Sequence, residues 1–434
     1  MSPTASDFSP IRRRLLLAAA LAGLPALGRA GEPARRQTVT VVTSYPDEFV
    51  SRLEAGFEAA HPQYRLQVIW RNARDAAPFL EQPGHGGADV YWSPSPRNFA
   101  RLAAAGIWRP LPVDRKPLPA RIGNTRLGDA EGFYTASEIA GFGFAYDPAW
   151  FAARQMRPPT DWDQLTDPRL AGLIALPVPQ QVGFAPPMVE IVLQAWGWDK
   201  GWALWSEIAG NALLVDRGAT FVTDHIADGR CCLGLSIDFF VNSAIANGAR
   251  IGFAYPRHTG LNPAHIAATR DSANPDGGKA FIDFVLSPAG QRLLLHPDIR
   301  RLPVRPDVYA DLPETQYNPF QAADRGGLQF DGNRARDRLA ISSAIFQHML
   351  AEVHDELRPL WQRVHRLEAS GRDLSAVRRA LSRPPIDEAG ADAPELRKIF
   401  ADNEKGERGL IAGWRLSCAT QRQEARRLLA EIEA

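Results

Sequence analysis

The chain has little sulfur and almost no net charge. Its 434 residues include three cysteines and four methionines, and 50 basic and 49 acidic side chains leave a formal charge of +1. A balance this even provides no basic surface of the kind that binds nucleic acids or acidic membranes, so we expect neither as a partner. Long hydrophobic runs are also missing, because the apolar stretch Leu15–Leu27 is too short to span a bilayer comfortably and no second one follows it.

Common signatures of enzymes and metal sites are absent as well. The sequence contains neither Gly-x-Ser-x-Gly nor His-Glu-x-x-His, which argues against a secreted hydrolase. Cys231, Cys232 and Cys418 do not have the spacing of a zinc site. A bridge between two adjacent strand cysteines would be strained, so the alternatives are a bond to Cys418 or free buried thiols. We expect no cofactor, no metal and no catalytic residue.

The N-terminus has the pattern of an export signal. Arg12, Arg13 and Arg14 precede the apolar stretch, and small residues around Ala30 suit cleavage. We predict a signal peptide over residues 1–30 and a location in the periplasm. The arginines fit a twin-arginine signal as well as a general secretory one.

Short apolar strands alternate with amphipathic helices at the start of the mature chain. Residues 38–43, 65–70 and 88–92 are typical of buried strands, and an apolar residue recurs every fourth position from Phe49 to Phe57. This alternation predicts an α/β fold with a mostly parallel sheet. Ligands of such sheets bind beyond the carboxyl ends of the strands.

Hydroxyl groups end the first strand. Thr43, Ser44 and Tyr45 come directly before a helix, where free N–H groups and the helix dipole favour an anion. The alternative is ordinary capping of that helix by Ser44 or Asp47.

The second and third strands are followed by further polar residues. Ser93 and Ser95 either bind a solute or cap a helix that begins near residue 96. Arg71 and Arg74 are candidates for a two-pronged contact with phosphate, and the alternative is a solvated arginine.

Two carboxylates stand in apolar surroundings. Glu138 lies in the stretch 132–146, which we predict to be two strands around Ser137 and Glu138, and it either accepts bonds from ligand hydroxyls or sits in a surface turn. Asp238 follows the buried part of a strand predicted over residues 229–240 and precedes two aromatic residues, and a buried charge there needs a partner, either a ligand or a structural group.

A polar group in the middle of the chain is a further candidate. Thr220, Thr223, Asp224 and His225 precede a helix-like turn at residues 226–229. They either face the ligand, with His225 sharing a proton with a phosphate, or form a helix cap with a surface histidine.

The second half of the chain contains several helical patterns. A helix predicted over residues 194–208 carries four tryptophans, which we interpret as core. A helix pair is predicted over residues 275–295 with a break at Ser287-Pro288. Between Leu339 and Leu367 an apolar stripe repeats every three or four residues, and Pro359 should kink or split its helix. The stripe packs on its own lobe or serves a partner.

Several segments together resemble the type 2 periplasmic solute-binding proteins of ABC importers. They are Val42–Tyr45, Asp161–Pro168 with Gly172–Pro177, and Ala273–Pro275 with Ala280–Gln291. Within that family, Gly87–Ser95 and Ile237–Phe240 look most like the branch that binds phosphoglycerate and hexose phosphates. A neighbouring branch binds ferric iron through paired tyrosines near the positions of Phe239 and Phe240, which have no phenolate oxygen.

The resemblance implies an α/β, two-lobed clamp with a C-terminal helical extension. The expected domains are lobe 1 at 38–145 and 256–319, lobe 2 at 146–255, and the extension at 320–434. The implied function is capture of a small anionic organic solute by hinge closure, with an ABC permease of the inner membrane as partner. The alternatives are a ligand-sensing subunit that reports to a membrane sensor kinase and a ferric-iron binding protein.

Overall fold

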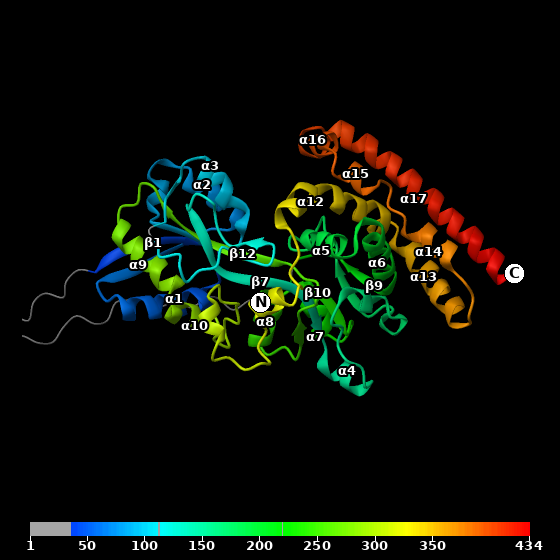
Figure 1. Cartoon of the computed structure of the whole chain (residues 1–434), viewed down its shortest axis with the longest axis horizontal. Helices are drawn as coiled ribbons and strands as arrows, with labels where there is room; N and C mark the ends of the chain where they lie inside the picture. Colours follow the sequence, from blue (N-terminus) through cyan, green and yellow to red (C-terminus); the bar gives the residue numbers. More distant parts are fainter. Residues whose placement is uncertain (1–35, 112, 219) are drawn as a thin grey trace, which may run out of the picture. The chain divides into compact units, whose positions relative to one another are not determined.

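The computed structural model describes residues 36–434, apart from residues 112 and 219 (Figure 1). The signal peptide predicted over residues 1–30 lies outside the described residues. No helix in the described part combines the length and the apolar character needed to cross a bilayer.

Ten of the strands form one mixed sheet, with two parallel groups joined by antiparallel strands. The order is β2-β1-β3-β12-β7-β10-β8-β9, with β4 beside β12 and β11 beside β7. A separate hairpin consists of β5 and β6. The strands are β1 Gln37–Thr43, β2 Tyr64–Trp70, β3 Val90–Ser93, β4 Trp108–Arg109, β5 Arg121–Ile122, β6 Thr125–Arg126, β7 Tyr134–Tyr146, β8 Ile174–Pro177, β9 Ala212–Val215, β10 Leu233–Ile237, β11 Gly252–Ala254 and β12 Leu261–Thr269.

The long strand β7 belongs to both halves of the sheet. Its residues 134–141 pair with β12, while its residues 142–146 pair with β10 and β11. Since nearly every residue of β7 is buried, the strand crosses through the centre of the protein. The structure therefore has two α/β lobes that share this crossing strand.

Helices cover both faces of the first lobe because its strands are apolar on both faces. Along β1, Val39 and Val41 share a core with α1 and α9, and Val42 packs on the opposite face with α2 and α3. The predicted break at Ser287-Pro288 is confirmed, since Ser287 caps α10. The helices of this lobe are α1 Asp47–Ala60, α2 Ala73–Leu80, α3 Phe99–Ala104, α9 Pro275–Leu286 and α10 Pro288–Leu293.

The second lobe is built in the same way on β8, β9 and β10. The predicted tryptophan core is confirmed for three of the four residues, because Trp198, Trp202 and Trp205 are buried with Ile174 and Leu176 of β8, while Trp196 is partly buried against the same core. Helices α7 and α8 cover the other face. The helices of this lobe are α4 Pro148–Ala153, α5 Pro186–Trp196, α6 Trp198–Asn211, α7 Phe221–Ala227 and α8 Asp238–Ala246.

The C-terminal helices form an extension on the second lobe. α12, α13 and α14 contact α5 and α6, and α17 contacts α13 and α14 from outside (Figure 1). The apolar stripe is buried in this packing, since Phe346, Leu350 and Leu357 share a core with Trp205 of α6. The stripe thus packs on its own chain. The helices are α12 Gly332–Phe346, α13 His354–Ala369, α14 Ser375–Ser382, α15 Glu388–Ala391, α16 Pro394–Asp402 and α17 Glu404–Glu433.

A linking segment, residues 303–331, connects the first lobe to this extension. It contains a 3-10 helix at Pro306–Tyr309 and the short helix α11, Pro319–Asp324. The backbone N–H of Asn124 in the first lobe donates to the carbonyl oxygen of Leu328 at 3.0 Å, and the backbone N–H of Asp331 donates to Oε1 of Gln194 on α5 at 2.7 Å. The linking segment is therefore fixed to both lobes.

Two strand predictions are wrong. The two strands predicted around Ser137 and Glu138 are the single strand β7, whose pairing with β12 shifts by one residue at this point. The strand predicted over residues 229–240 ends at Ile237, and Asp238 is the first residue of α8.

Two helix predictions are also wrong. The helix predicted over residues 194–208 is split into α5 and α6, because Gly197 between them has a φ of 79°. Pro359 lies within α13, and the interruption comes earlier, at residues 352–353. Because Pro359 stands in the second turn, its ring and missing N–H affect only the start of the helix.

The three cysteines are free and buried, which confirms the free-thiol alternative. Burial raises the pKa of Cys418 to about 11. Such thiols are poor nucleophiles at neutral pH.

Candidate functional site

A buried carboxylate on the crossing strand anchors a polar network between the lobes. Glu138 is 1% exposed, and its Oε1 accepts hydrogen bonds from Arg301 Nη1 at 2.7 Å and from the Tyr45 hydroxyl at 2.8 Å. The guanidinium of Arg301 also lies 4.7 Å from the ring centroid of Phe239. Arg301 belongs to the first lobe and Phe239 to the second, so this arginine joins the two.

A second buried carboxylate starts helix α8. Asp238 Oδ2 accepts hydrogen bonds from the backbone N–H of Gly141 and from the Tyr255 hydroxyl, both at 2.8 Å. Within the described residues, Glu138 Oε2 and Asp238 Oδ1 are buried without a hydrogen-bond partner. Buried oxygens of this kind are unfavourable until another group donates to them.

Burial raises the pKa of both carboxylates in this network, and Arg301 opposes both shifts. Burial raises the pKa of Asp238 to about 7, against the opposing hydrogen bonds from Gly141 and Tyr255. Burial also raises the pKa of Glu138, and the charge of Arg301 opposes that shift. The positive charge of Arg301 therefore stabilises two carboxylates, Glu138 and Asp238, and a pKa of about 7 means that Asp238 changes its charge near neutral pH.

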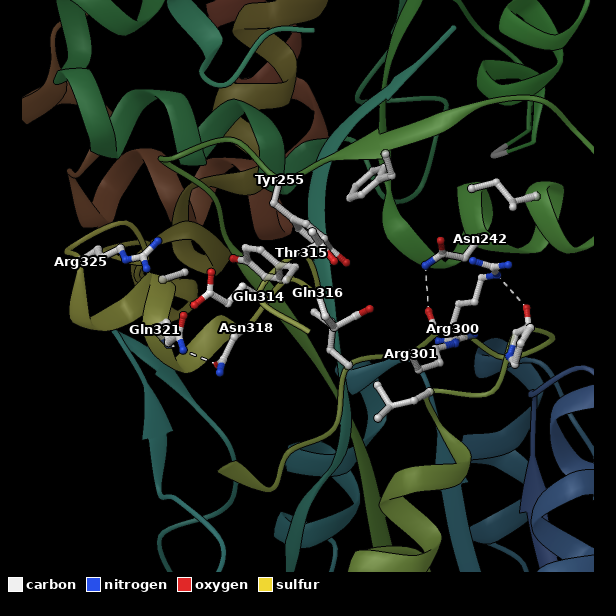
Figure 2. Close-up of a pocket in the computed structure, with 17 residues that line it drawn as sticks. Asn242, Tyr255, Arg300, Arg301, Glu314, Thr315, Gln316, Asn318, Gln321 and Arg325 are labelled. Atoms are coloured by element: carbon white, nitrogen blue, oxygen red, sulfur yellow. Dashed lines mark hydrogen bonds between the residues drawn. The ribbon is translucent and has the colours of Figure 1, made fainter. Parts of the chain in front are cut away.

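A cavity of about 850 Å³ lies beside the network (Figure 2). Arg301 and Tyr255 line this cavity and hold Glu138 and Asp238, so the two carboxylates form a layer behind the cavity wall. The volume suits a small-molecule ligand. The wall comes from both lobes and the linking segment: Asn242, Ile245, Phe253, Tyr255, Leu295, Pro297, Arg300, Arg301, Leu302, Glu314, Thr315, Gln316, Tyr317, Asn318, Gln321, Ala322 and Arg325.

The cavity wall carries a net positive charge. Arg300, Arg301 and Arg325 line it together with a single carboxylate, Glu314, while the charge of Arg301 is shared with Glu138 and Asp238 behind the wall. Figure 2 shows Arg325 on one side of the cavity and Arg300 on the other. This arrangement can receive an anion from opposite directions.

The linking segment is held in the wall by aromatic stacking. The rings of Tyr317 and Tyr255 are stacked, with centroids 3.7 Å apart and an interplanar angle of 13°. Tyr255 directly follows β11 and its hydroxyl also donates to Asp238 of α8. The linking segment, the end of β11 and α8 therefore meet at this point.

The structure brings the predicted hydroxyl residues of the first lobe together. Ser44 Oγ lies 3.5 Å from Ser93 Oγ, and Ser93 Oγ accepts a hydrogen bond from the N–H of Ser95 at 3.2 Å. Thr43 is buried and accepts from the N–H of Tyr45 at 3.2 Å. Helix α1 has no side-chain cap, so Ser44 is not used for capping. These residues do not line the cavity of Figure 2.

Other predicted residues lie apart from the network. Arg71 donates to its neighbour Trp70 at 2.8 Å and lies over the Phe79 ring. Thr220, Asp224 and His225 belong to the start and body of α7, and His225 Nδ1 donates to a carbonyl of the same helix at 2.7 Å.

Sequence analysis missed the residues of the cavity wall. Arg300 and Arg301 stand between Ile299 and Leu302, both buried, and two charges in such a stretch signal a need for partners. Tyr255 and Arg325 gave no comparable signal.

A family profile described as bacterial extracellular solute-binding protein matches residues 88–325, more than half of the chain. The chain belongs to this family. A curated relative of this solute-binding protein is the phosphoglycerate transport regulatory protein PgtC of Salmonella typhimurium, 27% identical over 299 residues, which are 69% of this chain and 74% of the relative. An uncharacterized protein of Haemophilus influenzae is 27% identical over 218 residues, 48% of this chain and 60% of that protein.

Solved structures of periplasmic binding proteins share the fold. Iron-bound HitA of Pseudomonas aeruginosa has a TM-score of 0.54 at 14% identity and covers 70% of this chain and 99% of its own. AfuA of Actinobacillus pleuropneumoniae, with fructose-6-phosphate bound, has a TM-score of 0.53 at 17% identity, and the match covers 70% of this chain and 98% of AfuA. The predicted two-lobed fold and the resemblance to this superfamily are confirmed.

The family places the protein among extracellular solute-binding proteins. Across the described residues, no cluster of three or more His, Cys, Asp or Glu side chains is arranged to hold a metal ion.

Proposed function

We propose that this protein is the periplasmic solute-binding component of an ABC importer and captures a small anionic organic solute between its lobes by hinge closure. The observation that carries the proposal is the set of arginines, Arg300, Arg301 and Arg325, around a cavity of about 850 Å³. Guanidinium groups bind carboxylate and phosphate oxygens through paired hydrogen bonds. The solute is then a phosphorylated or carboxylated metabolite, and the partner is an inner-membrane permease.

Two relatives support a phosphorylated solute over ferric iron. The name of PgtC refers to phosphoglycerate transport, and AfuA was solved with fructose-6-phosphate. HitA was solved with iron, but Phe239 and Phe240 of this chain cannot supply the phenolate oxygens that the iron-binding branch uses. An organic anion is therefore the first candidate.

The residues predicted from the sequence take different parts in this proposal. The hydroxyl residues at the ends of β1 and β3 do not line this cavity, so solute contacts from them stay predictions: Thr43, Ser44, Ser93 and Ser95. A second group acts indirectly by holding Arg301 and Tyr255: Tyr45, Glu138 and Asp238. Contacts from Arg71 and from Thr220, Asp224 and His225 of α7 stay predictions.

Thermal unfolding with defined ligands tests the ligand class. We expect 3-phosphoglycerate or fructose 6-phosphate to raise the melting temperature, because a ligand at one hundred times its Kd stabilises the folded state by about 2.7 kcal/mol. Fe(III) citrate should have no effect. A coloured protein stabilised by Fe(III) and by neither phosphate ester would overturn the proposal.

A pair of variants tests the cavity itself. Arg325→Gln should weaken binding of the same ester about tenfold, because one charged hydrogen-bond donor is lost. Arg372→Gln is the control, since Arg372 is exposed in the turn between α13 and α14. Equal losses in both variants would mean that the cavity is not the binding site.

A sensing role is the second candidate. The printed name of PgtC contains the word regulatory, and the linking segment connects the cavity to the helical extension. Ligand-dependent ATP hydrolysis by a reconstituted permease supports import, whereas ligand-dependent phosphorylation of a sensor kinase supports sensing. Turnover of a phosphate ester would contradict both, because we propose that the protein has no chemistry of its own.

Export is proposed from the sequence of residues 1–30. N-terminal sequencing of protein purified from the periplasm should begin near Gly31.

A further inference from the structure

One arginine of the cavity wall has a left-handed backbone conformation. Among the described residues other than glycine, φ is positive at His85 (52°), Gln155 (52°) and Arg300 (48°). A Cβ atom is unfavourable in this region, and glycine or asparagine normally takes such positions. The backbone alone would therefore select another residue at position 300.

Arg300 is an exposed residue that lines the cavity. Its Nε donates to the carbonyl oxygen of Pro297 at 2.7 Å, which fixes the plane of the guanidinium (Figure 2). Its Nη1 and Nη2 form no hydrogen bond or ion pair with any residue of the described ranges. Two charged donors thus remain for an anion in the cavity.

The same backbone turn connects the lobes. The carbonyl oxygen of Arg300 accepts a hydrogen bond from Asn242 Nδ2 at 2.8 Å. Asn242 lies on α8 of the second lobe and also lines the cavity. With this conformation the carbonyl oxygen of Arg300 points to α8 of the second lobe, while the side chain lines the cavity.

We infer that Arg300 binds the anionic group of the solute, and that its unfavourable backbone persists because it positions both the guanidinium and the carbonyl. This inference rests on the proposed function and gives Arg300 a specific part in it. The bond to Asn242 ties Arg300 to the second lobe, because the two partners come from different lobes.

Asparagine substitution tests the side chain, because asparagine tolerates the left-handed region. Arg300→Asn should raise the Kd for 3-phosphoglycerate at least tenfold in calorimetric titration and leave the melting temperature unchanged. Gln155→Asn is the matched control, since Gln155 has a similar φ after α4 and does not line the cavity. It should change neither quantity.

Glycine substitution tests the backbone. Arg300→Gly should melt at or above the wild-type temperature yet lose the same affinity, whereas Gln155→Gly should gain stability at unchanged affinity. Wild-type affinity in Arg300→Asn would overturn the inference, as would an Arg300→Gly variant that melts lower while Gln155→Gly melts higher. Wild-type protein that binds neither phosphoglycerate nor fructose 6-phosphate would instead remove the proposed function on which the inference rests.

Discussion

A buried glutamate is paired with an arginine at two places, where the helical extension packs on α6 and behind the cavity wall, but only one of these two glutamates is fully bonded. Where the extension packs on α6, Oε1 of Glu207 accepts from His365 at 2.8 Å and from Arg378 at 2.9 Å, and its Oε2 accepts from Arg378 at 2.7 Å. Arg378 also contacts both oxygens of Glu368. Every carboxylate oxygen of this cluster therefore has a donor.

Behind the cavity wall there are too few hydrogen-bond donors for the carboxylate oxygens. Glu138 and Asp238 share the charge of Arg301, and each has one oxygen without a hydrogen bond within the described residues. The pKa values differ accordingly. Burial raises the pKa of Asp238 to about 7, whereas burial of Glu207 is outweighed by hydrogen bonds from His365 and Arg378, which lower its pKa.

Similar residues can therefore contribute to stability or to binding, depending on how many hydrogen-bond donors surround them. The cluster around Glu207 joins the extension to α6, because His365 and Arg378 of the extension supply a donor to each of its oxygens. The cluster around Glu138 keeps unused acceptors beside a cavity. Such incomplete bonding is unfavourable by itself and is typical of functional sites.

Removal of Arg378 should give the largest effect. Arg378→Met leaves Glu207 and Glu368 without their shared cation, so we expect a loss of about 3–5 kcal/mol in the free energy of unfolding. Urea unfolding followed by tryptophan fluorescence measures this change. Arg372→Met is the control, because Arg372 is exposed nearby. Equal midpoints for the two variants would show that the extension cluster is not a stabilising one.

The pH dependence of stability should separate the two clusters. The ordinary pKa of Asp238 is 3.8 and burial raises it to about 7, so the folded state binds a proton that the unfolded state releases. Stability from this residue is therefore full below about pH 4 and declines as pH rises to about 7. Between pH 5 and 7 the decline amounts to about 2–3 kcal/mol.

Two substitutions resolve these contributions. Asp238→Asn should remove the decline, which thermal unfolding between pH 5 and 8 would reveal as a flatter curve. Glu207 has the opposite sign: its lowered pKa stabilises above its ordinary pKa of 4.5, and this stability is lost on acidification. Glu207→Gln should therefore reduce acid sensitivity only. Identical pH profiles for Asp238→Asn and wild type would contradict the assignment.

Local patterns were enough to predict much of the fold. The strand β1 and the helix α1 were predicted because apolar spacing depends only on neighbouring residues. The prediction of a break at Glu138 is wrong because a carboxylate in an apolar run looks like a turn. The strand continues there because Arg301 and Tyr45, distant in sequence, supply its partners.

The site was predictable only where a topology rule applies. Ser44 and Ser93 come together because they stand at the carboxyl ends of β1 and β3, which are neighbouring parallel strands. Arg301 is 163 residues from Glu138, and no local pattern connects the two. Arg325 lies in the linking segment, whose position in the cavity wall depends on tertiary contacts such as the stacking of Tyr317 on Tyr255.

This stacked tyrosine pair gives the smallest and most specific test of the cavity wall. Tyr255→Phe removes the hydroxyl that donates to Asp238, so we expect a loss of about 1–2 kcal/mol in stability and a further rise in the pKa of Asp238. Tyr317→Phe is the matched control, because the Tyr317 hydroxyl is buried without a partner within the described residues and its removal should leave stability unchanged or slightly higher. Both variants keep the stacked rings. Chemical unfolding at pH 6 and pH 8 measures both effects, and a larger loss in Tyr317→Phe would mean that the partner of Asp238 has been misidentified.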